Sequence, residues 1–176
     1  MDITRNYFEF LGLSVGFDID QAQLSERYRA LQQQLHPDRH AHQSDREQRL
    51  AVQYTTYLNE ALATLKSPLK RAQYLLSLQG IDTLADTRAQ LDPLFLMEQM
   101  ELRERVAEAP DHADPEAELE ALDAQVARAL KQLQAEFAAA WGAQALAEAE
   151  QLVRKMQFMV KLQSEVEALE ERLFDD

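Results

Sequence analysis

The chain has 176 residues, no Cys, 18 Lys and Arg against 31 Asp and Glu, and a formal net charge of −13. The lack of Cys excludes disulfides, thiolate metal ligands and a Cys nucleophile. No stretch approaches the roughly 18 apolar residues of a membrane span, and the N-terminus lacks the basic and apolar regions of a signal peptide. The acidic charge argues against binding nucleic acid. We therefore expect a soluble, cytoplasmic protein of one or two domains.

The charge is unevenly distributed along the chain. Residues 1–79 hold nine Lys and Arg and nine Asp and Glu, so the whole net charge of −13 falls in residues 80–176. This asymmetry predicts two modules with different partners.

In the first half, Gly and Pro separate the apolar patterns into helices. A short helix is predicted for residues 7–11 and ends at Gly12. Asp20 is the expected N-cap of a second helix, whose apolar side chains recur every three or four residues until Pro37 ends it. These recurring side chains are Leu24, Tyr28, Leu31 and Leu35.

A third helix is predicted to begin at a capping box formed by Ser44 and Glu47. Ser67-Pro68 then opens a short fourth helix, which ends at Gly80. The apolar and aromatic face of the third helix comprises Leu50, Tyr54, Tyr57, Leu58, Ala61, Leu62 and Leu65.

The second half contains three more predicted helices. Asp92-Pro93 opens the first, Asp114-Pro115 opens a long second helix, and the third follows Gly142. No alternating run predicts a strand, so we expect an all-α protein whose second half is an up-down three-helix bundle. The predicted domains are residues 1–79 and 92–176, with residues 80–91 as a connection.

The tripeptide His36-Pro37-Asp38 follows one amphipathic helix and precedes another, so we expect it at the exposed tip of an antiparallel hairpin. Pro37 fixes the backbone and Asp38 offers an anionic acceptor, which suits docking against a basic groove. A metal site of His36, His40 and His42 is an alternative, although Pro37 breaks the helix that would align the first two. A hydrolase pair of His36 and Asp38 is another, but no Ser or Cys nucleophile lies beside it. A plain surface turn is the third.

Several motifs together resemble the J-domain family. They are the segment NYFEFLGL at residues 6–13, the His36-Pro37-Asp38 loop, the segment LNEALATL at residues 58–65, and then Pro68, Arg71, Ala72 and Tyr74. The resemblance covers about residues 4–75. It implies a protein that binds a DnaK-type chaperone and stimulates its ATP hydrolysis, and that is not itself an enzyme.

The J-domain resemblance also implies which residues contact the chaperone. In the family, the Asp of the loop engages an Arg of the ATPase, and basic residues near it contact an acidic face. The positions that match here are Arg27, Arg29 and Arg39, beside His36-Pro37-Asp38. The chain departs from the family at residues 32–34, three Gln where positive charge is common, which implies a dedicated chaperone over a generic one.

The predicted helix after Asp92 is apolar on two sides. Phe95, Leu102 and Val106 fall within about 40° of one another and form the expected core stripe. Three further apolar side chains lie on the other side, bordered by Glu101 and Glu104. These three are Leu96, Met97 and Met100. Because three bundle helices cannot easily surround one of their own members, the second face predicts a surface for a partner.

Phe158 is also unusual for its place on the last predicted helix. It points away from the core direction of the last helix, and an antiparallel bundle would place it beside Leu96 and Met100. A single exposed aromatic is ordinary, so two interpretations remain: Phe158 belongs to the same surface as Leu96 and Met100, or it is an isolated exposed side chain. A homodimer seam of Leu96, Met97 and Met100 is an alternative use of the same surface.

Three segments resemble the HscB family, the J-type co-chaperones of bacterial iron–sulfur cluster assembly: AQYLLSLQG at 72–80, FLMEQMELRE at 95–104 and VRKMQF at 153–158. This resemblance implies that the C-terminal domain binds an IscU-like cluster scaffold and that the J-domain delivers it to an HscA-like chaperone. The family's scaffold-binding positions match Leu96, Met97, Met100, Glu101, Glu104 and Phe158. We expect no cofactor or metal, no nucleic-acid or membrane partner, and a monomer. A J-domain adaptor for a different client is the alternative.

Overall fold

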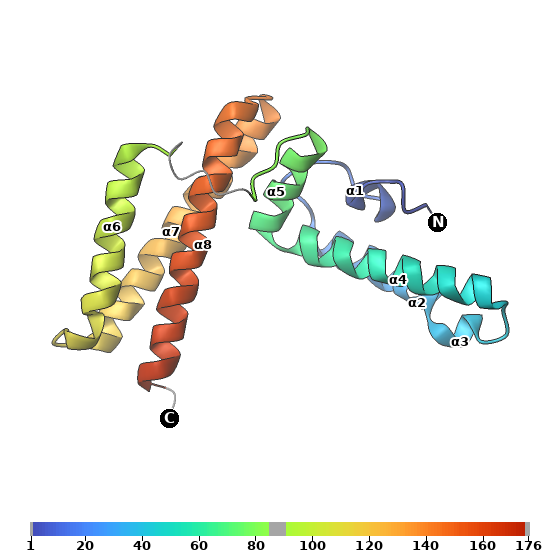
Figure 1. Ribbon diagram of the computed structural model, residues 1–176, viewed down its shortest axis with the longest axis horizontal. Helices are drawn as coiled ribbons and strands as arrows, with labels where there is room; N and C mark the ends of the chain where they lie inside the picture. The colour runs from blue at the N-terminus through green and yellow to red at the C-terminus, as the bar shows by residue number, and fades with distance from the viewer. Residues whose placement is uncertain (1, 85–90, 175–176) are drawn as a thin grey trace. The chain divides into compact units, whose positions relative to one another are not determined.

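The computed structural model describes residues 2–84 and 91–174 (Figure 1). All regular elements within these residues are helices, which confirms the all-α prediction. The chain divides into two compact units, Met1–Leu78 and Gln79–Asp176. None of the helices in the described part combines the length and apolar character needed to cross a bilayer.

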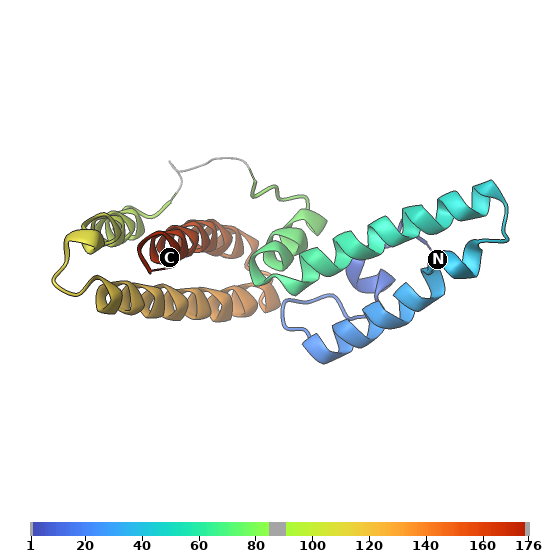
Figure 2. The same cartoon turned by 90° about the horizontal axis from the view of Figure 1, so that it is seen from below.

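The first unit is built on an antiparallel pair of helices, α2 and α4, with the short α3 at the turn between them (Figures 1 and 2). Its core is formed by side chains that include Phe8, Leu24, Leu58, Leu65 and Leu75, all at most 1% exposed. The helices of the unit are α1 (Tyr7–Phe10), α2 (Gln21–Leu35), α3 (Pro37–His40), α4 (Asp45–Lys66) and α5 (Pro68–Leu78).

Local chemistry sets the ends of these helices, largely as the sequence predicts. The Asp20 carboxylate accepts from the backbone N–H groups of Ala22 and Gln23 at the start of α2. Ser44 Oγ accepts from the Glu47 N–H at 3.3 Å, which is one half of the predicted capping box. Gly12 follows α1 with φ +68°, a left-handed conformation that costs glycine little.

Arg71 joins α4 to α5 inside the first unit. Its side chain is 6% exposed and Nη1 donates to the Leu65 carbonyl at 2.6 Å, so it satisfies an oxygen that the end of α4 leaves free. Its guanidinium lies 4.7 Å from the centre of the Phe17 ring. Burial lowers the pKa of Arg71, but an Arg stays charged at physiological pH.

An aromatic cluster fixes the N-terminal segment to α4 and α5. The Tyr7 and Tyr74 rings stack at 4.4 Å, and Tyr74 Oη accepts from the Tyr7 N–H at 2.9 Å. The Tyr57 hydroxyl donates to the Arg5 carbonyl, and burial raises the pKa of Tyr57 to about 12, which keeps that hydroxyl protonated.

The second unit contains a long antiparallel pair, α7 and α8, with α6 packed along it (Figures 1 and 2). Its helices are α6 (Pro93–Glu108), the short 3₁₀ helix η2 (Ala109–Asp111), α7 (Pro115–Gly142) and α8 (Leu146–Phe174). Asp92 and Asp114 cap α6 and α7 through bonds to the N–H groups of Leu94 and Ala117. At its other end α6 stops at Glu108, and the chain continues directly into η2.

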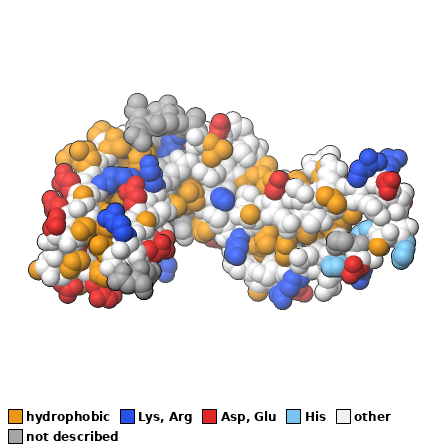
Figure 3. Space-filling model, turned by 60° about the horizontal axis from the view of Figure 1, so that its bottom comes forward, with side chains coloured by type: hydrophobic (Ala, Val, Ile, Leu, Met, Phe, Trp, Pro, Cys, Tyr) orange, Lys and Arg blue, Asp and Glu red, His pale blue; other side chains and the backbone are white. Residues whose placement is uncertain are grey.

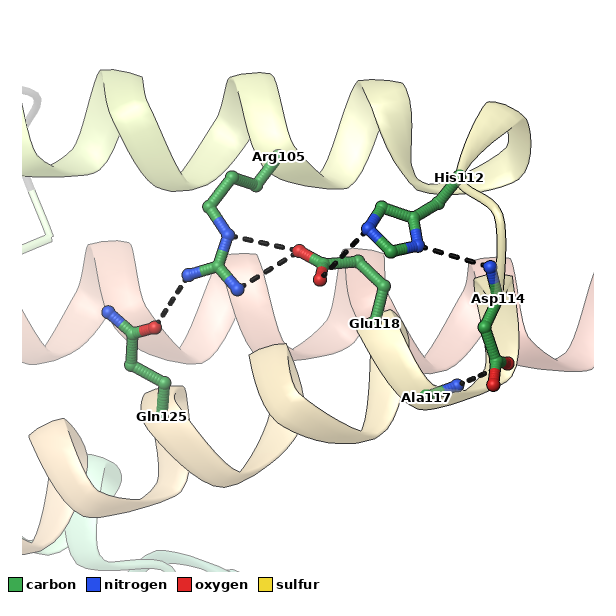
Figure 4. A network of polar contacts seen from close by, with 6 residues as sticks. All are labelled: Arg105, His112, Asp114, Ala117, Glu118 and Gln125. Carbon is green, nitrogen blue, oxygen red and sulfur yellow. Dashed lines mark hydrogen bonds and ion pairs between the residues drawn. The ribbon is translucent and has the colours of Figure 1, made fainter.

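A polar network fastens the C-terminal half of α6 to α7 (Figure 4). Arg105 donates to Glu118 Oε1 at 3.0 Å and to Gln125 Oε1 at 2.7 Å. His112 Nε2 lies 3.8 Å from Glu118 Oε2. A separate contact joins α6 to α8: Arg103 Nη1 donates to both carboxylate oxygens of Glu165, at 3.0 and 2.9 Å.

The start of the predicted connection lies against α8. Gln157 Nε2 donates to the Thr83 carbonyl at 2.7 Å, and Arg154 Nη2 lies 3.5 Å from the Asp82 carbonyl. Thr83 is 2% exposed, so this part of the connection is packed and not a free linker. Residues 85–90, the centre of the predicted connection, lie outside the described residues.

Candidate functional site

The His36-Pro37-Asp38 turn lies where α2 ends and α3 begins. His36 Nδ1 accepts from the Asp38 N–H at 3.2 Å, and the Arg39 N–H donates to the His36 carbonyl at 3.0 Å. The tripeptide lies between the paired helices α2 and α4, and the sequence analysis did not predict that His36 caps a one-turn helix starting at Pro37. Pro is favoured at this first helical position, since its missing N–H needs no partner there.

The turn holds a carboxylate out in solvent. The Asp38 side chain is 91% exposed and that of His36 is 57% exposed, with 3.5 Å between His36 Nδ1 and Asp38 Oδ2. The histidine side chains of the first unit gather at one end of it (Figure 3). A carboxylate in this position is available to an external cation, and a guanidinium offers the geometry that matches it.

The three predicted basic residues are exposed, and two of them also have contacts within the unit. Arg29 Nε donates to the Ser25 carbonyl at 3.3 Å, one turn back along α2. The Arg27 guanidinium lies beside Gly12, where an added Cβ would stand 3.6 Å from its Cζ. Arg39 lies in α3, directly after the turn. All three guanidinium groups are therefore accessible from solvent, and that of Arg27 lies beside Gly12.

Within the described residues, the histidines are not arranged as a metal site would need. Both ring nitrogens of His40 already lie against oxygen atoms, those of Gln43 and of the Gln34 backbone. Across residues 2–84 and 91–174, no three His, Asp or Glu side chains are grouped as a metal site would need.

On α6, the predicted partner surface is exposed at its methionines. Met97 and Met100 are 59% and 63% exposed, and Glu101 and Glu104 are exposed beside them. Leu94, which the sequence analysis did not single out, is 62% exposed. The sequence feature that could have identified Leu94 is its place directly after the Asp92-Pro93 cap, as an apolar side chain in the first turn of the helix. We call Leu94, Met97 and Met100 the exposed α6 surface.

The remaining two predicted residues are half-buried. The Leu96 side chain is partly exposed to solvent and partly covered by the protein. The Phe158 ring of α8 meets the ring of Phe95 edge-on, with 6.3 Å between the ring centroids. Phe158 therefore belongs to the contact between α6 and α8 as well as to the surface. Gln99, also missed by the sequence analysis, is 4% exposed on the core side of α6.

Comparison with known proteins covers both units. Residues 6–74 match the family model described as "DnaJ domain", and residues 91–167 match the "HSCB C-terminal oligomerisation domain". The chain is 47% identical over 173 residues to the "Co-chaperone protein HscB homolog" of Vibrio cholerae, covering 96% of this chain and 98% of that protein.

Solved structures agree with these matches. The structure of "Chaperone HscB from Vibrio cholerae" has a TM-score of 0.86 and 43% identity, covering 97% of this chain and all of that one. The crystal structure of the human co-chaperone protein HscB has a TM-score of 0.91 and 31% identity, covering 98% of this chain and 86% of that one. Such proteins regulate the ATPase of a partner and are not enzymes themselves. The chain belongs to the HscB family of J-domain co-chaperones.

Proposed function

We propose that this chain stimulates an HscA-like, DnaK-type chaperone and delivers an IscU-like iron–sulfur scaffold protein to it. Residues 1–79 act as the J-domain and residues 92–176 as the scaffold-binding domain. His36, Pro37, Asp38, Arg27, Arg29 and Arg39 contact the chaperone. Leu96, Met97, Met100, Glu101, Glu104 and Phe158 contact the scaffold.

The observation that carries this proposal is the exposed Asp38 carboxylate, held by a His36-capped turn in a unit that matches the DnaJ domain. Within the described residues, the nitrogen nearest to pairing with this carboxylate is His36 Nδ1 at 3.5 Å, and that nitrogen already accepts from the Asp38 N–H. An aspartate kept in solvent at a helix start contributes little to packing, so an external partner explains it better than internal stability does. The exposed α6 surface supports the proposed binding of the scaffold, since the flexible Met side chains adapt well to a partner.

The decisive experiment measures ATP hydrolysis by the HscA-like chaperone with this chain, with and without the scaffold. Asp38→Asn should abolish stimulation, because losing a charge-assisted contact in a docked interface costs about 2–5 kcal/mol. Circular dichroism and melting of the variant should match the unmodified chain, since the carboxylate is exposed. Normal stimulation by Asp38→Asn would overturn the chaperone-binding assignment. A J-domain adaptor for another client would instead show stimulation that the scaffold does not change.

A second use of the exposed α6 surface is favoured by one observation. The family model matched by residues 91–167 is described as an oligomerisation domain, and Leu94, Met97 and Met100 could form a seam between two copies. Light scattering of the purified chain decides between this seam and the monomer that we propose. A dimer that dissociates on Met100→Asp substitution would assign the surface to self-association.

A further inference from the structure

The turn that carries Asp38 is tied to both neighbouring helices by side-chain hydrogen bonds. The first tie is the His40 imidazole, whose Nε2 lies 2.9 Å from the Gln34 carbonyl oxygen. That carbonyl belongs to the last turn of α2, where backbone oxygens have no partner within the helix. The other ring nitrogen, Nδ1, lies 2.6 Å from Gln43 Oε1, just before α4. The imidazole thus bridges the end of α2 to the segment that enters α4.

The second tie is the Gln48 side chain in the first turns of α4. Its Nε2 reaches three backbone carbonyls, those of His40 at 3.2 Å, Ala41 at 3.3 Å and Gln43 at 3.3 Å. These oxygens lie at the end of α3 and in the segment after it, where the His40 carbonyl also accepts from the Gln43 N–H at 3.1 Å. One amide group therefore holds the backbone that returns from the His36-Pro37-Asp38 turn.

We propose that His40 and Gln48 are positioning residues, which hold the His36-Pro37-Asp38 turn in the shape that docks on the chaperone, and that His40 does so fully only as an imidazolium. This inference rests on the proposed docking of Asp38 on the chaperone. Neither residue needs to touch the chaperone, because each acts by fixing the backbone on the C-terminal side of Asp38. We call the pair the turn clamp.

The dependence on protonation follows from the two oxygens around the ring. An imidazolium donates from both nitrogens, so it satisfies the Gln34 carbonyl and Gln43 Oε1 together. A neutral imidazole has one donor, so one nitrogen lone pair then faces an oxygen. These two bonds raise the pKa of His40, that to Gln43 first. With a raised pKa in the folded chain, the clamp is complete below the ordinary value of about 6.5 and weakens as pH rises through the folded value.

The charges around the ring do not reverse this direction. Arg39 on α3 lowers the pKa of His40 and Glu47 on α4 raises it, and both act less than the hydrogen bonds. The last turn of α2 carries no charged side chain, and the first turn of α4 also holds Asp45 and Arg46. A rotated Gln43 amide would donate to the ring instead and would remove the dependence on pH. The experiment below separates these two arrangements.

The test measures chaperone ATPase stimulation between about pH 6 and about pH 8, the range in which a histidine changes charge. The quantity compared is the concentration for half-maximal stimulation, for the unmodified chain relative to His40→Gln at each pH. The intrinsic pH response of the chaperone cancels in this ratio. At low pH the unmodified chain should need a lower concentration than His40→Gln for half-maximal stimulation. We expect this difference to shrink by about 3- to 10-fold as pH rises, the effect of losing one charge-assisted hydrogen bond. A ratio that is constant across the range would overturn the protonation half of the inference.

His42→Gln is the matched control, because His42 is exposed two residues away and forms no hydrogen bond within the described residues. It should keep the pH profile of the unmodified chain. Gln48→Met should weaken stimulation about 3- to 10-fold at every pH, whereas Gln53→Met, on an exposed part of the same helix, should not. Equal stimulation by Gln48→Met and Gln53→Met would overturn the Gln48 half.

A direct measurement on the unmodified chain covers the case in which a variant fails to fold. The imidazole resonances of His40 and the ¹⁵N relaxation of amides 36–44 are followed over the same pH range. We expect motion of these amides to increase as His40 loses its proton, and amides that do not respond would contradict the clamp. The proposed function is tested separately by Asp38→Asn. If that variant loses stimulation while the His40 ratio stays flat, the proposed docking of Asp38 stands and the protonation half of the inference is overturned.

Discussion

Gln99 is a polar side chain on the core side of α6. The side chain is 4% exposed, and Nε2 donates to Met159 Sδ of α8. Its Oε1 is buried without a hydrogen-bond partner among the described residues. A buried acceptor left unpaired costs about 1–3 kcal/mol, because it has lost its water and gained nothing in return. We therefore expect this polar group to lower the stability of the contact between α6 and α8.

The first prediction follows from this unpaired oxygen. Gln99→Met has similar volume and no polar atoms, so it should raise the free energy of unfolding of the chain by about 1 kcal/mol. Urea denaturation followed by circular dichroism measures the change. Gln132→Met is the control, because Gln132 is exposed and loses only its bond to Glu136 on the surface of α7. Destabilisation by Gln99→Met would show that Oε1 has a partner, such as a buried water.

Residue-scale placement could be predicted from the sequence where it depends on local chemistry. Asp20, Asp92 and Asp114 cap helices as expected, since a cap needs only the next two or three residues. Burial could not be predicted as well, because it depends on which helix lies opposite. Val106 is half-buried where the core stripe was expected, and Gln99 fills a core position that its polarity had concealed.

At the scale of helices, α7 and α8 bring like charges together near one end of their pair. Glu116 and Glu120 of α7 line the same shallow hollow as Glu167, Glu170 and Glu171 of α8. Burial, then Asp123 and the neighbouring glutamates, raises the pKa of Glu170. The hollow is an acidic surface whose repulsion opposes the packing of the two helices.

The second prediction is that Glu170→Gln stabilises the chain at neutral pH and does so less in acid. The folded pKa of Glu170 is raised, so the fold favours the protonated form and gains stability as pH falls toward the folded value. An amide removes that repulsion at all pH values, with a gain of about 0.2–0.5 kcal/mol for each like-charge pair removed. Melting temperature measured at about pH 7 and about pH 4.5 checks this sign.

The control for that prediction is Glu148→Gln in the first turn of α8, outside the acidic hollow. An acid there interacts favourably with the N-terminus of the helix, so its removal should not stabilise the chain. Equal stabilisation by both variants would mean that the overall charge of −13, and not the hollow, sets the effect.

The helices themselves were predictable because Pro, Gly and capping residues divide the chain, and because apolar side chains recur at helical spacing. The one-turn α3 was missed, since its four residues are too few for any periodic pattern. On α6, the helical spacing of the apolar residues separates the core side from the side of Met97 and Met100, and both methionines are exposed. It could not show that Phe158 packs edge-on against Phe95, which depends on how α6 lies along α8.

At the scale of the whole molecule, the two units differ in the partners that their surfaces suit. Residues 1–79 carry no net charge and expose Asp38 and Arg39 at one turn and Arg29 on the preceding helix α2. Residues 80–176 carry the net charge of −13 and present apolar side chains among charged ones (Figure 3). An adaptor needs two such surfaces that can be disabled one at a time. This separation is what the family resemblance implies and what a pair of variants can test.

The last prediction is that Met97→Ala with Met100→Ala removes scaffold binding and leaves the J-domain active. Both side chains are more than half exposed, so truncation leaves no core cavity and should change stability by no more than about 0.5 kcal/mol. Buried interface anchors, by contrast, typically cost about 2 kcal/mol or more each when truncated, which is a loss of about 30-fold per residue. Titration of the scaffold and melting of the same variant give both quantities. Chaperone stimulation without scaffold should persist, while its enhancement by scaffold should disappear.

Val52→Ala is the matched control, because Val52 is an apolar side chain 67% exposed in the other unit and should leave scaffold binding unchanged. Asp38→Asn should show the reverse pattern, with normal scaffold titration and no stimulation. Leu96 and Phe158 are left intact in this design, since both are half-buried and their truncation would mix a loss of packing with a loss of contact. Scaffold affinity unchanged by the double substitution would remove the exposed α6 surface from the binding site, even if the chaperone half of the proposal held.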